Sequence, residues 1–126
     1  NIVNPNKMLY SYNFSFDDLA KINTPASNNI TVSNSRLSLT SGTQGIMVSI
    51  EKTTTVSVSS VHLLVNGEQL SLANVQFFIS ADGTDNWQSV LINNLTSVTN
   101  TGTQLKLRIV LSSSLTYIDS LALLFK

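Results

Sequence analysis

The sequence has 126 residues, of which 42% are hydrophobic and only 11% are charged. Seven basic and seven acidic residues cancel, so the chain has no net charge to attract nucleic acid or anionic lipid. It contains no cysteine, which excludes disulfides and thiolate metal sites, and no apolar run approaches the roughly 20 residues of a membrane span. One domain over residues 1–126 is the simplest organisation for this length. Because the chain begins at Asn1 rather than Met, we expect it to be processed or excised from a longer one.

The first third of the chain predicts a strand followed by a hairpin. Aromatic and polar residues alternate over 10–16, which is typical of a half-buried strand with an aromatic core face. A short helical turn is expected at 17–21 and a loop at 23–25. The short apolar runs 30–32 and 37–39 flank a Ser-Asn-Ser turn and predict a hairpin.

The middle of the chain predicts two further strands and a second hairpin. Apolar residues at the even positions of 46–50 predict a strand that buries them. A second strand is expected over 56–65, with a bulge at Ser59-Ser60 where the apolar phase changes. Asn66-Gly67 is typical of a type I′ hairpin turn, because both residues tolerate positive φ. Its partner strand is expected near 69–72.

The last part of the chain has the clearest alternation. Strands are expected at 75–79 and 87–92, joined by a turn at Asp82-Gly83. Residues 105–111 predict a strand with leucine and isoleucine inside and charged residues outside. Residues 117–125 are apolar on both faces, which favours a central strand. About eight or nine strands at this spacing predict an all-β fold, an antiparallel two-sheet β-sandwich.

The residues needed for catalysis are scarce. His62 is the only histidine and lies between core-facing residues of a predicted strand, so we expect an exposed or hydrogen-bonded strand residue. A nucleophile-and-base triad would need the same histidine, and no G-x-S-x-G motif is present. The glycines are too dispersed to form a phosphate loop. We therefore expect a protein that is not an enzyme and needs no cofactor.

The most distinctive stretch is 80–87, which contains Asp82, Asp85, Asn86 and Trp87. Its oxygen ligands would suit Ca²⁺, although no bidentate glutamate follows at an EF-hand position. The alternative, which we favour, is a polar hairpin whose aspartate accepts backbone N–H groups. Trp87 could stack on a sugar ring, but burial as a core anchor is favoured by the apolar residues that follow it.

The second half of the chain resembles a module of bacteriophage virion proteins. The likeness consists of Ser-x-Asp-Gly at 80–83 after a strand, Trp87 on the next strand, a Gly-x-x-Leu-x-x-Arg strand from Gly102, and Ile-Asp-x-Leu at 118–121. It covers residues 75–125 and implies a jelly roll similar to galactose-binding and carbohydrate-binding modules. Such modules occur in tail fibres, baseplate or neck appendages and capsid-attached proteins.

The stretch 80–87 also resembles an Asp-box, Ser-x-Asp-x-Gly-x-Thr-Trp. Ser80, Asp82 and Trp87 match in register, whereas Thr84 replaces the glycine and Asn86 replaces the threonine. In the families that carry it, this box is a structural hairpin rather than a catalytic site.

These resemblances imply a non-enzymatic module of the virion, exposed on the particle surface. It would attach the particle to a host-surface saccharide or decorate the particle, with other virion proteins as partners in an oligomer and without nucleic acid or membrane insertion. Asp82, Asp85, Asn86 and Trp87 are the candidate ligand-binding residues. Two alternatives are a purely structural capsid or tail assembly protein, and a carbohydrate-binding module of a bacterial glycoside hydrolase.

Overall fold

The computed structural model describes residues 8–126, which are almost entirely β structure. The strands are β1 (Tyr10–Phe14), β2 (Ile30–Ser33), β3 (Arg36–Leu39), β4 (Gly45–Val48), β5 (Lys52–Glu68), β6 (Val75–Ser80), β7 (Gln88–Val90), β8 (Leu95–Leu111) and β9 (Tyr117–Phe125). A single turn of 3-10 helix, η2 (Thr24–Ala26), lies between β1 and β2, and no helix of the described residues is long and apolar enough to cross a membrane. The predicted all-β fold class is confirmed.

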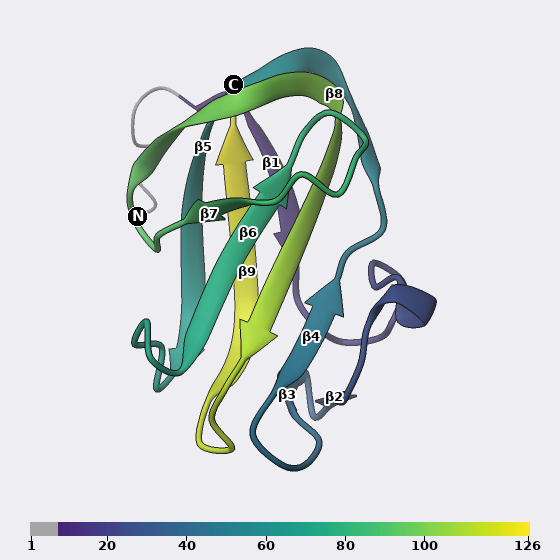
Figure 1. Ribbon diagram of the computed structural model, residues 1–126, viewed down its shortest axis with the longest axis vertical. Helices are drawn as coiled ribbons and strands as arrows, with labels where there is room; N and C mark the ends of the chain where they lie inside the picture. Colours follow the sequence, from purple (N-terminus) through teal and green to yellow (C-terminus); the bar gives the residue numbers. More distant parts are fainter. Residues whose placement is uncertain (1–7) are drawn as a thin grey trace.

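The strands form a sandwich-like arrangement of two layers. Hydrogen bonds join the nine strands of the described residues in the order β2-β3-β9-β5-β8-β6-β7, with β1 also paired to β9 and β4 to β8. In Figure 1, β6, β7 and the end of β8 lie in front of β5, β9 and β1. The named strands pair antiparallel throughout. The jelly-roll topology implied by the resemblance stays a prediction.

Two long strands connect the layers. β5 and β8 each have 17 residues, and Figure 1 shows both passing over one end of the molecule. The first part of β8 pairs with β5, and its last part pairs with β6 on one edge and β4 on the other. The second half of β5 pairs with β9. The layers are therefore continuous through hydrogen-bonded backbone as well as through the core.

The core lies between the layers and follows the predicted alternation. In β8 the four alternating apolar residues are fully buried, and the three of β6 are at most 3% exposed. The aromatic face of β1 is buried from Tyr12 onward, whereas Tyr10 is 37% exposed and stacks on Phe125. Strand β9 is central, with β5 on one edge and β1 and β3 on the other, as its apolar composition predicts.

Two predicted local features are present. The hairpin of β2 and β3 turns at Asn34 and Ser35, both with positive φ. The register between β5 and β8 shifts between Val58 and Ser60, which confirms the bulge predicted from the change of apolar phase.

The prediction of a hairpin at Asn66-Gly67 is wrong. Both residues lie inside β5, which continues to Glu68 opposite β9, and residues 69–72 are not a strand. The register shifts between Asn66 and Gly67, and a Cβ at Gly67 would collide with the carbonyl oxygen of Tyr117. The glycine is therefore required by a close approach at a bulge and not by a turn.

Two smaller expectations in the first half are also wrong. Residues 17–21 contain a single hydrogen-bonded turn, in which the Ile22 N–H donates to the Leu19 carbonyl, but no helix. The 3-10 helix lies instead at Thr24–Ala26, where Pro25 suits a first turn and the side chain of Asn23 accepts from the Ala26 N–H. In β4 it is Met47 that is fully buried, while Ile50 is 43% exposed. Met47 and Val48 are adjacent and both buried, so burial in this strand does not alternate and could not be predicted from a period of two.

Candidate functional site

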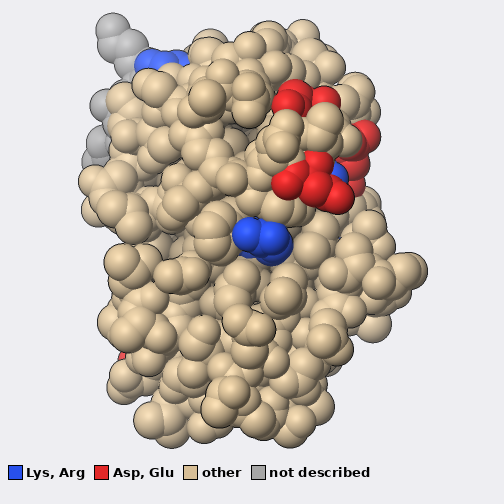
Figure 2. Space-filling model, viewed as in Figure 1, with Lys and Arg blue, Asp and Glu red and all other residues tan. Residues whose placement is uncertain are grey.

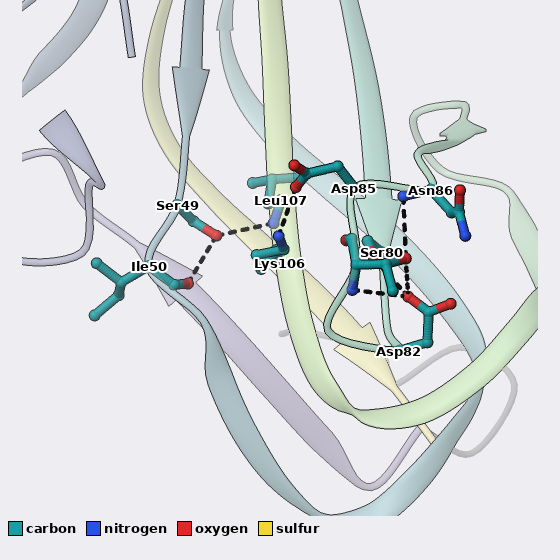
Figure 3. A network of polar contacts seen from close by, with 9 residues as sticks. Ser49, Ile50, Ser80, Asp82, Asp85, Asn86, Lys106 and Leu107 are labelled. Carbon is teal, nitrogen blue, oxygen red and sulfur yellow. Dashed lines mark hydrogen bonds and ion pairs between the residues drawn. The ribbon is translucent and has the colours of Figure 1, made fainter. Parts of the chain in front are cut away.

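The loop after β6 is held together by its own hydrogen bonds. Oδ1 of Asp82 accepts from the Thr84 backbone N–H at 3.0 Å, from the Thr84 hydroxyl at 2.6 Å and from the Ser80 hydroxyl at 3.2 Å. Gly83 adopts positive φ, and the Asn86 N–H donates to the Thr84 hydroxyl. Figure 3 shows Ser80, Asp82 and Asn86 around one compact turn beside β8.

This bonding gives Asp82 a structural role. Hydrogen bonds from Thr84, the largest cause, lower the pKa of the Asp82 carboxyl below its ordinary value, because they stabilise the ionised form. As predicted for a polar hairpin, the Asp82 carboxylate accepts hydrogen bonds from its own loop. In the part of the chain that the structure describes, no group of three His, Cys, Asp or Glu side chains lies close enough to hold a metal ion.

Asp85 and Trp87 meet at Lys106. The Asp85 carboxylate accepts a hydrogen bond and ion pair from Lys106 Nζ at 2.8 Å, which Figure 3 shows reaching from the loop to β8. The same ammonium lies 5.3 Å from the centre of the Trp87 ring. The structure thus brings two of the four candidate residues onto one cation, whereas Asn86 is exposed beside them.

Trp87 does not anchor the core, contrary to the favoured interpretation of the sequence. Its side chain is half-buried on the outer face of the β6–β8 layer, where the Arg108 guanidinium carbon lies 5.0 Å from the ring centre. The reason is the strand register. Gln88, the residue after Trp87, pairs with Ile79 of β6, and Ser80, the residue after Ile79, pairs with Lys106 of β8. The indole therefore lies beside the outward-facing side chains of β8.

Arg108 is the residue of this site that the sequence analysis missed. It lies directly opposite Phe78 in the β6–β8 register, and its guanidinium carbon is 4.4 Å from the Phe78 ring centre. Burial, the larger cause, lowers the pKa of Arg108, and the charge of Asp85 opposes that shift. The sequence does indicate that Lys106 and Arg108 lie on the same face of one strand. It does not indicate which aromatic rings lie beside them, because that depends on strand pairing.

His62 lies away from this surface. It is 4% exposed on β5, and its Nε2 is 3.0 Å from Oδ1 of Asn93, a residue with positive φ. The expectation of a hydrogen-bonded strand residue is confirmed.

Comparison with known proteins does not assign the chain to a family. No protein-family model matches the chain, and no curated protein matches its sequence.

Proposed function

We propose that this chain is a non-enzymatic saccharide-binding module that attaches a bacteriophage particle to its host surface. The observation that carries the proposal is the position of Trp87, half-buried on an outer sheet face rather than in the core. Aromatic rings in such positions offer an apolar face for a sugar ring, while neighbouring polar groups fix its hydroxyls. Asp85 and Asn86 supply such groups beside the indole. The virion assignment is supported by the sequence resemblance of residues 75–125.

The surroundings of Trp87 also suit weak recognition. Figure 2 shows that most of this side of the molecule carries no charge, with acidic atoms gathered at the upper right and basic atoms near the centre and at the upper left. The ring is held by its position between the loop and the strand, so little conformational entropy is lost when a sugar stacks on it.

A glycan array probed with the purified chain tests this function, followed by titration of any glycan that binds. Trp87→Ala should weaken binding by about tenfold, because an aromatic contact contributes about 0.5–1.5 kcal/mol beyond its area and 1.4 kcal/mol is tenfold. Tyr117→Ala is the matched control, since Tyr117 is the ring against Arg36 on the other layer. An array without any bound glycan, or full binding by Trp87→Ala, would overturn the proposal.

One observation favours a second candidate, a building block of the particle. The outer face of the β9 layer has a groove of about 490 Å³ and an adjoining one of about 350 Å³, which share Asn13, Leu64 and Ala122 in their linings. Leu9, 75% exposed, lines the second groove. Apolar grooves of this kind suit contact with another subunit.

The two candidates separate by experiment. If another virion subunit occupies the grooves, Leu124→Lys, in the lining of the second groove, should abolish assembly into particles while glycan binding persists. Assembly that is unchanged in this variant would rule out the building-block candidate.

A further inference from the structure

We propose that the saccharide bound at Trp87 is acidic, and that its carboxylate is held by the guanidinium of Arg108. This inference rests on the proposed saccharide-binding function and specifies the chemical class of its ligand. It follows from the contacts of Arg108, from its lack of a partner and from the distribution of charge around it.

The contacts fix the guanidinium in place without using its N–H groups. Phe78 and Trp87 lie 4.4 Å and 5.0 Å from the guanidinium carbon, within the roughly 6 Å range of cation–π interactions. Such contacts leave the N–H edges of the planar group available. A guanidinium that is held by two rings is preorganised to bind a planar anion with two parallel hydrogen bonds.

No residue of the described chain satisfies those N–H groups. Arg108 Nε is the only buried side-chain nitrogen or oxygen in residues 8–126 that has no hydrogen-bond partner, and Arg108 takes part in neither ion pair of these residues. Because Nε is shielded while the residue as a whole is partly exposed, we infer that a ligand reaches the two Nη atoms. A carboxylate that accepts one hydrogen bond from each Nη therefore fits this arginine end-on.

Two of the other cations on strands next to aromatic rings, Arg36 and Lys106, differ in this respect, whereas Lys52, 5.5 Å from the centre of Tyr12, also has no ion pair within residues 8–126. Arg36 lies 3.9 Å from the centre of Tyr117 and donates to Asp119 at 2.9 Å. Lys106 has Asp85 as its partner. Arg108 lacks a carboxylate although its guanidinium carbon lies within 5.0 Å of two aromatic ring centres.

The surrounding charges set the orientation of the ligand. Asp82 and Asp85 lie in the loop after β6, where Asp85 is bound to Lys106, and Figure 2 shows acidic atoms gathered toward one corner of this face. An anion would be repelled there, so the carboxylate lies toward Arg108 and the sugar hydroxyls lie toward Asp85 and Asn86, which accept or donate hydrogen bonds. The apolar face of the pyranose covers the exposed part of Trp87.

The test uses the fluorescence of Trp87, the only tryptophan in the chain, as a reporter of this surface. The purified chain is titrated with oligoglucuronic acid and with a neutral oligoglucose of the same linkage and length. The acidic oligomer should bind at least tenfold more tightly, and its affinity should fall between low and high salt, whereas that of the neutral oligomer should not. Inorganic phosphate in a third titration distinguishes a sugar carboxylate from simple anion binding, and saturation by phosphate alone at the same affinity would overturn the proposal.

Variants assign the effect to the guanidinium. Arg108→Gln should remove the preference for the acidic oligomer, and Arg108→Lys should reduce it, because a lysine offers charge without the planar pair of donors. Arg36→Gln is the matched control and should retain the full preference. A thermal melt of each variant confirms that it is folded, and Arg108→Lys keeps the test valid if Arg108→Gln does not fold.

The outcomes separate this inference from the function on which it rests. Equal binding of both oligomers that is lost in Trp87→Ala would overturn the acidic ligand and leave the saccharide-binding function standing. Full acidic preference in Arg108→Gln would overturn the role of the guanidinium and likewise leave the saccharide-binding function standing. Absence of any glycan binding, here and on the array, would overturn both.

Discussion

Arg36 on β3 and Arg108 on β8 both lie against aromatic rings on outer strand faces, yet they differ in what completes them. Arg36 has its ring, Tyr117, and its carboxylate, Asp119, on the neighbouring strand β9. Arg108 has two rings, and Asp85, the acidic group whose charge acts on it, is bound to Lys106. The first cluster is closed and explained by cross-strand pairing. The second is open, which is the pattern expected where a ligand supplies the missing group.

The largest expected loss of stability comes from shortening the buried leucines of β3 and β8, the strands that carry Arg36 and Arg108. Leu107 and Leu37 are fully buried. The backbone N–H of Leu107 donates to the Ser49 hydroxyl, and the Ser49 N–H donates to the Leu107 carbonyl. Each Leu→Ala change should lower the free energy of unfolding by about 2–5 kcal/mol. Leu107→Ala should fall near the top of that range and Leu37→Ala near the bottom, because β3 pairs with β9 over only two residue pairs.

Urea unfolding measures both free energies. Equal losses would show that the two strands support their clusters equally, and the distinction between an anchored β8 and a more peripheral β3 would then fail.

The next effect compares the arginines themselves. Arg36→Met should lower the free energy of unfolding by about 0.5–1 kcal/mol, since it removes an exposed ion pair and a stacking contact. Arg108→Met should change it less, because the loss of the two cation–π contacts is offset by removal of the shielded, unpartnered Nε. Chemical denaturation of the two variants side by side tests this difference. A loss at Arg108 as large as that at Arg36 would make its cluster structural.

The smallest expected effect is on how the stability of the protein depends on pH. Near Arg36, hydrogen bonds from Ser35 and then Ser15 lower the pKa of Asp17, just as hydrogen bonds from Thr84 lower the pKa of Asp82 near the other cluster. A lowered folded-state pKa stabilises the protein above the ordinary aspartate value of about 3.9, and this stabilisation is lost as the pH falls through the folded-state pKa.

Asp17→Asn and Asp82→Asn should therefore reduce the melting temperature slightly at neutral pH. The difference from the parent protein should shrink as the pH falls well below about 3.9, where the aspartates are protonated. Thermal melts between neutral and strongly acidic pH measure it. A difference that is constant across this range would show that these carboxylates do not act through their ionised form.

The fold was predictable where burial alternates along a strand. Residues 105–111 and 75–79 occupy the predicted positions, and the bulge before Ser60 was visible as a change of phase. The prediction failed where pairing with a distant strand overrides a local signal. Asn66-Gly67 has the composition of a turn, but β9 pairs across it and continues β5.

The candidate site was predictable only in part, for the same physical reason. The loop of Asp82 is local, so its composition indicated its structure. Trp87 and Arg108 are distant in sequence and meet because β6 places Phe78 opposite Arg108. No pattern within either segment contains that register, so the arginine could not be identified as part of the site before the strands were paired.

The continuity of β8 between the layers has a consequence for how the molecule opens. In a sandwich of two independent sheets, one sheet can detach and expose its amides while the other persists. Here the same strand donates and accepts hydrogen bonds in both layers, so separation of the layers requires β8 to leave β5, β6 and β4 together. The amide protons of both layers should therefore exchange with solvent through one global event, with similar protection on each side. Contacts so distant in sequence also imply slow folding relative to helical domains of this size.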